Sequence, residues 1–226
     1  MRRNIKIISL TLFGLLMVCA GLAGAAHKGE GANFYSLNPT DSLIQVYEDP
    51  ARAEWQKPER VVEQFSLKPG QIVADIGAGT GYFSVIFAKK VGESGKVHAV
   101  DIDGNMVEYL EKRARKDGLK NIKPILAKRN DPLLPEASTD LIFLCNTYMF
   151  IEQREQYLAR LKDILKKDGL LAIVSYNKVE TPEGSPIHTR VSREKTIQEA
   201  EKAGFALEVE YFFLQYQHFL VFRKRL

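Results

Sequence analysis

Three glycines on alternate positions constrain the fold of this chain more than any other feature. They lie in the stretch "VADIGAGTGYFSVIF", residues 73–87, and are Gly77, Gly79 and Gly81. Glycine has no Cβ, so it accepts positive φ and lets a ligand approach the backbone closely. Residues 71–76 are typical of a strand buried on both faces, and residues 82–91 are typical of a packed helix. The sequence therefore predicts a strand, a glycine turn and a helix, as in nucleotide-binding crossovers, although a plain tight turn is the simpler alternative.

An acidic residue follows at the distance that such crossovers use to bind a ribose. A second strand candidate, "KVHAV" (96–100), ends in Asp101, twenty positions after Gly81. A carboxylate there can accept both hydroxyls of an adenosine ribose. A dinucleotide site favours G-x-G-x-x-G, whereas here position 82 is Tyr and the third glycine comes one residue early. A nicotinamide-dependent reductase is therefore an alternative that the glycine spacing disfavours, and the chain has no Y-x-x-x-K pair to support it.

The two motifs together carry a family resemblance. "VADIGAGTGYFS" followed by "AVDID" resembles the first motifs of class I S-adenosylmethionine (SAM) methyltransferases, of the small-molecule type 11/25 and quinone-biosynthesis group. The likeness covers roughly residues 55–223. It implies an α/β, doubly wound, Rossmann-like sheet of seven strands in the order 3-2-1-4-5-7-6, with one antiparallel strand. It also implies SAM as cofactor and methyl transfer to a small molecule. Quinone enzymes often carry His-His after the fourth strand, where this chain has Met149-Phe150, so the acceptor does not follow.

Hydrophobic periodicity beyond the glycine turn fits that fold, because strand and helix patterns alternate. The further strand candidates are residues 122–127, 139–146 and 170–176, and residues 205–225 predict two strands joined tightly. The further helix candidates are residues 56–67, 105–117, 154–165 and 193–203. Capping residues support these limits: Ser192 suits the start of the last helix, and Gly169 suits the position after the helix over 154–165.

The resemblance also implies how the cofactor is held. Asp75 orients the turn and reaches the amino group of SAM, and the three glycines lie under its methionine and ribose portions. Asp101 takes the ribose hydroxyls, and Ile102 packs on the adenine face. The loop pair Asn130–Asp131 reads the adenine amino group, and Asn146 lies beside the transferring methyl. The predicted cofactor-binding residues are thus Asp75, Gly77, Gly79, Gly81, Asp101, Ile102, Asn130, Asp131 and Asn146.

The expected reaction asks little covalent chemistry of the protein. The methyl group of SAM is already activated by the sulfonium, so the protein must align a lone pair of the acceptor with this methyl group and exclude water. No metal site is predicted, since the chain has no H-E-x-x-H and no Cys/His ligand spacing. Tyr148 and His188 are the predicted catalytic residues, with His188 as a general base in an exposed loop. Further acceptor-side candidates, each with ordinary packing as the alternative, are Trp55, Tyr47, Tyr216 and His218.

The charge distribution separates the start of the chain from its body. The 226 residues carry a net charge of +4, of which Arg2, Arg3 and Lys6 supply three positive charges, while residues 1–26 contain no acid. The nearly neutral body argues against a large nucleic-acid face, so a small-molecule acceptor is the expected partner. The basic run over 112–129 is read as a solvated helix face and its loop.

Residues 1–26 are typical of a targeting segment. A basic start precedes an apolar run from Ile7 to Val18 and then small residues, which indicates a signal peptide or an uncut membrane anchor. An exported or membrane-anchored protein is expected, or a cytoplasmic one if this leader is not functional; a lipoprotein site at Cys19 is a further alternative. Residues 27–54 are predicted as a linker and N-terminal segment, and 55–226 as the methyltransferase domain. Because SAM is made in the cytoplasm, an exported, non-catalytic SAM-fold binding protein remains the competing function.

Overall fold

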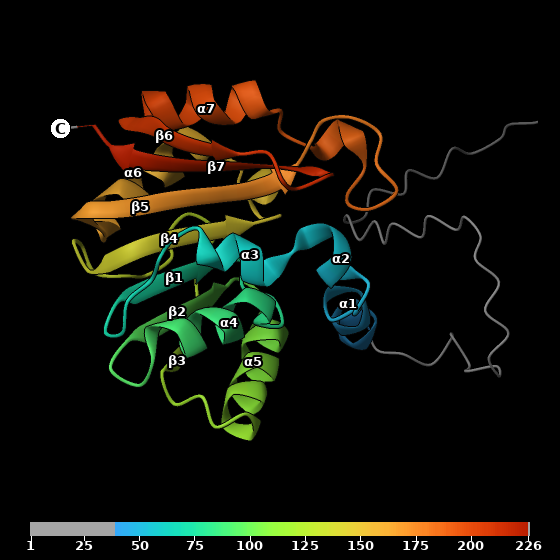
Figure 1. Ribbon diagram of the computed structural model, residues 1–226, viewed down its shortest axis with the longest axis vertical. Helices are drawn as coiled ribbons and strands as arrows, with labels where there is room; N and C mark the ends of the chain where they lie inside the picture. Colours follow the sequence, from blue (N-terminus) through green and yellow to red (C-terminus); the bar gives the residue numbers. More distant parts are fainter. Residues whose placement is uncertain (1–38, 226) are drawn as a thin grey trace, which may run out of the picture. The chain divides into compact units, whose positions relative to one another are not determined.

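The sheet has the predicted topology. The computed structural model describes residues 39–225, and its seven strands are hydrogen-bonded in the order β3-β2-β1-β4-β5-β7-β6 (Figure 1). The strands are Ile72–Ile76 (β1), Lys96–Asp101 (β2), Ile122–Leu126 (β3), Thr139–Cys145 (β4), Leu165–Tyr176 (β5), Phe205–Tyr211 (β6) and Gln217–Lys224 (β7). Strand β7 runs antiparallel to both of its neighbours, while the pairs among β1 to β5 are parallel. The α/β doubly wound fold is thus confirmed.

Helices follow the strands in alternation and cover the sheet. They are Pro39–Tyr47 (α1), Arg52–Gln56 (α2), Pro58–Glu63 (α3), Tyr82–Val91 (α4), Gly104–Lys116 (α5), Arg154–Ile164 (α6) and Arg193–Lys202 (α7). Short 3₁₀ turns span Tyr148–Phe150 (η1) and Ile187–Thr189 (η2). Side chains cap two helices: Asp103 accepts a hydrogen bond from the amide of Asn105 at α5, and Ser192, as predicted, accepts one from the amide of Lys195 at α7.

Two apolar layers hold the sheet between its helices. On one face, Phe83 and Phe87 of α4 pack against Phe143 of β4, with ring centroids 4.8 Å and 5.1 Å from it. On the other face, Leu158 of α6 and Ala200 of α7 are fully buried in a second cluster. Alternate residues of each strand point to opposite layers, which is why the central strands are nearly continuous apolar runs.

The structure corrects the expected end of the sixth helix. Helix α6 ends at Ile164 and β5 begins at once at Leu165, so Gly169 lies inside a strand rather than after a helix. A Cβ on Gly169 would lie 3.0 Å from the carbonyl oxygen of Thr139 and 3.2 Å from that of Asp140. Glycine is therefore needed here because β4 and β5 approach closely at a register shift.

The segment predicted as a linker contains two helices, α1 and α2, which together we call the N-terminal strap (residues 39–56). Its side chains contact the glycine turn, so the folded domain begins earlier than residue 55. The predicted leader, residues 1–26, lies outside the described residues. Within residues 39–225, no helix combines the length and the apolar character that a membrane span requires.

Candidate active site

The glycine turn has the geometry that its sequence predicts. Gly77, Gly79 and Gly81 have φ angles of +73°, +54° and +83°, which lie in the left-handed region. The amides of Gly77 and Ala78 both donate to the carbonyl of Val100 at the end of β2, over 2.8 Å and 3.0 Å. The turn is thereby fixed at the carboxyl ends of β1 and β2, directly before helix α4. A residue with a side chain would be strained at each of these glycines.

Asp101 is attached to this turn through the backbone. Its Oδ2 accepts a hydrogen bond of 2.8 Å from the amide of Gly79, and its Oδ1 accepts one of 3.0 Å from the amide of Asp103. The half-buried carboxylate is therefore held in one orientation at the end of β2. This geometry fits the ribose-binding prediction, because each oxygen keeps a further lone pair for a ligand hydroxyl.

Asp75 is the second carboxylate of the turn and lies in a different environment. It is 3% exposed at the end of β1, and its Oδ2 accepts a hydrogen bond of 2.6 Å from the hydroxyl of Ser84. The pKa of Asp75 is raised to about 7, chiefly by burial and in part by the charge of Asp101, while Ser84 and Arg52 oppose the shift. A cationic group placed beside this carboxyl would favour its ionised form, which suits the ammonium group of an amino acid.

The adenine side of the predicted site is only partly assembled. Ile102 is 52% exposed next to Asp101, so its side chain is open to a ligand. The Oδ1 of Asp131, by contrast, accepts hydrogen bonds from the amide of Leu133 (2.8 Å) and from Nε of Arg160 (3.3 Å). One oxygen of that carboxylate thus holds its own loop, and the predicted adenine role of Asp131 stays a prediction. Asn130 is exposed in the same turn, and its adenine role stays a prediction.

Side-chain amides meet at the carboxyl ends of β4 and β5. Asn146 has a φ of +57°, and its Oδ1 accepts a hydrogen bond of 2.7 Å from Nε2 of Gln217 at the start of β7. Nε2 of Gln56 lies 3.3 Å from Oε1 of Gln217 and 2.9 Å from Sγ of Cys145. Burial raises the pKa of the Cys145 thiol to about 12, so this thiol is protonated at neutral pH and is no nucleophile. The network brings α2, β4 and β7 together beside the glycine turn.

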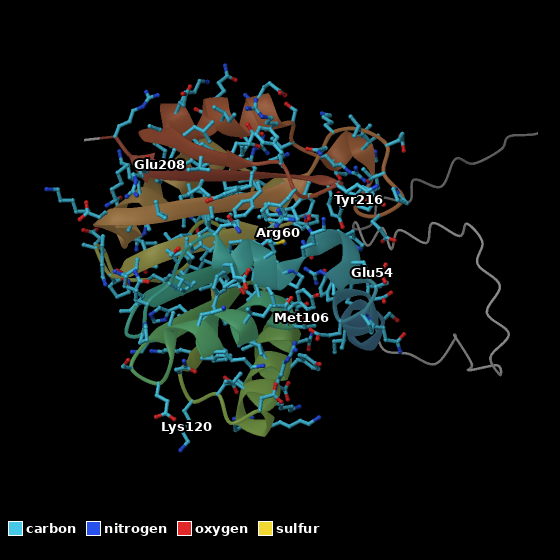
Figure 2. The ribbon with its side chains drawn as sticks, viewed as in Figure 1. Glu54, Arg60, Met106, Lys120, Glu208 and Tyr216 are labelled. Atoms are coloured by element: carbon cyan, nitrogen blue, oxygen red, sulfur yellow. The ribbon has the colours of Figure 1, made fainter. Side chains whose placement is uncertain are left out.

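Aromatic side chains extend this amide network. The ring of Trp55 lies 5.7 Å from that of Tyr176 and 6.1 Å from that of Tyr216, centroid to centroid. Figure 2 labels Tyr216 and, on α2, Glu54, the neighbour of Trp55; both lie at the end of the sheet where α2 sits. The prediction named Trp55 and Tyr216 but missed Tyr176, whose signal was its place as the last residue of the fifth strand. We call these three residues the aromatic trio.

Tyr148 is wrongly predicted as catalytic. Its side chain is fully buried, and its hydroxyl donates a 2.6 Å hydrogen bond to Glu199 of α7, which also pairs with Arg154 at 2.7 Å. Burial raises the pKa of Tyr148 well above its ordinary value. The hydroxyl thus joins η1 to α6 and α7 in the core. A tyrosine directly after a strand end does not reveal from sequence which way it points.

The two histidine candidates have different surroundings. His218 is 4% exposed in β7 on the face that packs against α6 and α7, and burial lowers its pKa to about 4, so it is neutral and remote from the trio's face. His188 is exposed on η2. The loop that carries η2 is ordered by Arg190, whose guanidinium donates to the carbonyls of Asn177, Val179, Glu183 and Ser185. A general-base role for His188 stays a prediction.

The N-terminal strap covers the glycine turn. The ring of Tyr47 lies over Gly79, since a Cβ built there would be 3.4 Å from its Cδ2. The carboxylate of Glu48 accepts hydrogen bonds from the hydroxyl of Thr80 and, over 2.5 Å, from Nη1 of Arg113 on α5. Tyr47 was predicted for the site, whereas Glu48 was missed because an acid ahead of the domain gives no pattern of its own. No group of three or more potential metal ligands occurs in the described part of the chain.

Comparisons with known proteins agree with this site. A family model described as a methyltransferase domain matches residues 67–210. The crystal structure of a SAM-dependent methyltransferase from Aquifex aeolicus superimposes with a TM-score of 0.77 at 32% identity, covering 80% of this chain and 96% of that chain.

Two curated relatives are also similar. Aklanonic acid methyltransferase from Streptomyces sp. (strain C5) is 35% identical over 116 residues, which are 51% of this chain and 53% of that protein. A ubiquinone/menaquinone biosynthesis C-methyltransferase from Hydrogenovibrio crunogenus is 26% identical over 129 residues, 57% of this chain and 50% of that protein. The chain thus spans about half the length of the curated relatives it matches. With the family model and the Aquifex structure, these findings show that the chain belongs to the SAM-dependent methyltransferases.

Proposed function

We propose that the protein methylates a small, partly aromatic molecule that binds against the aromatic trio. The observation that carries this proposal is the position of the trio beside the Asn146–Gln217–Gln56 amides, next to the glycine turn. Rings offer a flat apolar surface to an aromatic acceptor, and the amides offer donors and acceptors that orient its polar groups.

The residues of the glycine turn fit the cofactor in chemistry as well as in place. Gly79 adds no side chain between the backbone and a ligand, Asp101 presents carboxylate oxygens suited to ribose hydroxyls, and Asp75 suits an ammonium group. When bound, SAM supplies a methyl group activated by its sulfonium. The protein's own contribution is to orient the acceptor, to exclude water and to offer aromatic faces, which stabilise a nearby positive charge.

The names of the relatives support a small-molecule acceptor. They include enzymes named for aklanonic acid, for ubiquinone and menaquinone biosynthesis, and for (S)-coclaurine. Their names give different acceptors, although each is similar to this chain over 115 to 129 residues. We therefore propose the acceptor class for this protein and leave the methylated atom, O, N, S or C, to the experiment.

A methyl-transfer screen tests the proposal. Full-length protein would be incubated with tritiated SAM and separate panels of phenols and quinones, aromatic amines, transfer RNA and protein. We expect transfer to one of the two aromatic panels. Trp55→Ala should lower that turnover at least tenfold while leaving the affinity for S-adenosylhomocysteine within twofold, and Phe212→Ala, an exposed aromatic outside the trio, is the matched control. Transfer confined to RNA or protein would contradict the proposal, and so would binding of SAM without transfer to any panel.

We also propose that residues 1–26 direct the protein across or into a membrane. The motivation is the basic start followed by the apolar run from Ile7 to Val18. Cell fractionation followed by N-terminal sequencing tests this. Cleavage after Ala25 or Ala26, or an intact chain in the membrane fraction, is expected, whereas an intact chain found wholly in the cytoplasmic fraction would contradict it.

A further inference from the structure

The N-terminal strap places one arginine between the two halves of the site. Arg52, the first residue of α2, lies with its guanidinium carbon 4.2 Å from the centre of the Tyr82 ring. Its Nη1 donates a 2.7 Å hydrogen bond to the carbonyl of Tyr47, and its Nε donates to Oε1 of Gln56. These contacts fix the plane of the guanidinium and leave some of its five N–H donors for another partner.

The charge of Arg52 is not neutralised by any acid that the structure describes. Among the side chains that the structure describes, those of residues 42–225, there are thirteen ion pairs of arginine and lysine, and Arg52 belongs to none of them. The residue is nevertheless partly buried. A partly desolvated cation without a counterion is costly, and such groups are usually found where an anion binds.

The surroundings of Arg52 show which part of a ligand it faces. Burial raises the pKa of Asp75 at the end of β1, of Cys145 at the end of β4 and of Tyr176 at the end of β5, and the positive charge of Arg52 opposes each of these shifts. Arg52 therefore lies near the carboxyl ends of three strands, on the side of the glycine turn where Asp75 is buried. An acidic and a basic group near each other match a zwitterion, and the amino-acid end of SAM is one.

We infer that Arg52 binds the α-carboxylate of the methionine portion of SAM, while Asp75 faces its ammonium group. The inference rests on the methyltransferase function above and adds a residue that lies outside both sequence motifs. The guanidinium suits this role because its planar fork can donate two parallel hydrogen bonds to one carboxylate. An acidic group on the methyl acceptor is the competing anion, and the two possibilities predict different binding behaviour.

Two nucleosides that differ in the amino-acid portion distinguish these possibilities. S-adenosylhomocysteine carries the carboxylate, and 5′-methylthioadenosine lacks the whole amino-acid end. Calorimetric titration of the full-length protein is expected to show that Arg52→Ala weakens S-adenosylhomocysteine binding at least tenfold and leaves 5′-methylthioadenosine binding within twofold. Arg52→Lys should recover only part of the loss, because a compact ammonium lacks the fork. Unchanged binding of 5′-methylthioadenosine also shows that the variant is folded.

A second arginine of the same region is the matched control. Arg60 on α3 lies over the ring of Phe213, 4.2 Å from its centre, and Arg60→Ala should leave both affinities unchanged. Equal weakening of both nucleosides in Arg52→Ala would overturn the inference, because a displaced strap affects the whole site. Unchanged S-adenosylhomocysteine binding would overturn it as well and would favour an acidic acceptor. If the wild-type protein bound neither nucleoside, the methyltransferase function itself would fail, together with the inference.

Discussion

The two halves of the site are built from different kinds of groups. On the side of β1 and β2, main-chain amides and two carboxylates form the cofactor half, fixed by the left-handed turn around Gly79 and by its hydrogen bond to Asp101. On the side of β4, β5 and β7, the proposed acceptor half consists of side-chain amides and the aromatic trio. A substitution of one residue cannot remove main-chain amides from a site unless the backbone refolds. It can readily replace the side-chain amides and aromatic rings of a site. This difference explains how one fold keeps a cofactor and varies its acceptors.

The largest expected effect comes from breaking the backbone-built half. Gly79→Val introduces a branched side chain at a φ of +54° and under the ring of Tyr47, so SAM binding should fall at least a thousandfold, measured by calorimetry. Gly104→Ala is the matched control, since nothing lies within 4 Å of its Cβ position and its φ is not positive; binding should be unchanged. A folded Gly79→Val variant with normal affinity would show that the turn does not cradle the ligand.

The pH dependence of the free energy of unfolding tests the buried environment of Asp75 in the cofactor half. Because burial raises the pKa of Asp75 from 3.8 in the unfolded chain to about 7, the folded protein holds an extra proton between these values. Its contribution to stability is present below about pH 4 and is lost as pH rises to about 7. Between pH 5 and pH 8 the loss should be roughly 2–3 kcal/mol, at about 1.4 kcal/mol per pKa unit.

Urea unfolding at pH 5 and pH 8 measures this effect. Asp75→Asn keeps an acceptor for the Ser84 hydroxyl but cannot titrate, so its stability should fall less than that of the wild type over the same range. Parallel pH dependence in the two proteins would mean that Asp75 is already ionised at pH 5.

The carboxylate of Asp101 should contribute to the affinity for SAM. Asp101→Ala removes charge-assisted hydrogen bonds to the ribose, which should cost about 1.5–3 kcal/mol of binding free energy, or tenfold or more in affinity for SAM. Asp140→Asn is the control, because Asp140 makes comparable bonds, to the amide of Ile72 and to Lys166, at the amino ends of β1 and β4, the end of the sheet opposite the glycine turn. Equal affinities in Asp101→Ala and the wild type would remove the ribose assignment, and tighter binding of NADH than of SAM would point to the reductase alternative.

The smallest effect is expected from a change to Tyr148, which is buried in the core and is not one of the residues of the acceptor half. Tyr148→Phe removes the hydroxyl that donates to Glu199 but keeps the buried ring, so stability should fall by about 1–2 kcal/mol in urea unfolding. Methyl transfer by the folded protein should stay within twofold of the wild type. A Tyr148→Phe variant of full stability that has lost its transfer activity would restore the catalytic role that the sequence suggested.

The cofactor half and the sheet order were predictable because their signals are local. The three glycines, the acid after the second strand and the alternating apolar runs each lie within a short window of sequence, and each is dictated by backbone conformation. The role of Asp131 is less determined by such a window, since a loop carboxylate can turn to an arginine as readily as to a ligand. In this protein Arg160 of α6 donates a hydrogen bond to the carboxylate of Asp131.

The acceptor half was not predictable in the same way because its contacts join distant segments. Gln56 meets Cys145 and Gln217, and Tyr148 meets Glu199, and no periodicity links such pairs. The strap was missed for a related reason: two short helices rich in polar residues look like a linker until the turn they cover is in place.

The antiparallel direction of β7 means that the site combines residues made early in synthesis with residues made late. Because this last strand runs against its neighbours, its first residue, Gln217, arrives at the carboxyl ends of strands made much earlier. The residues of the turn around Gly79 and its partner Asp101 are all made in the first half of the chain, whereas Gln217 is made near its end. Asn146 therefore gains its partner only when the last strand of the sheet has been made.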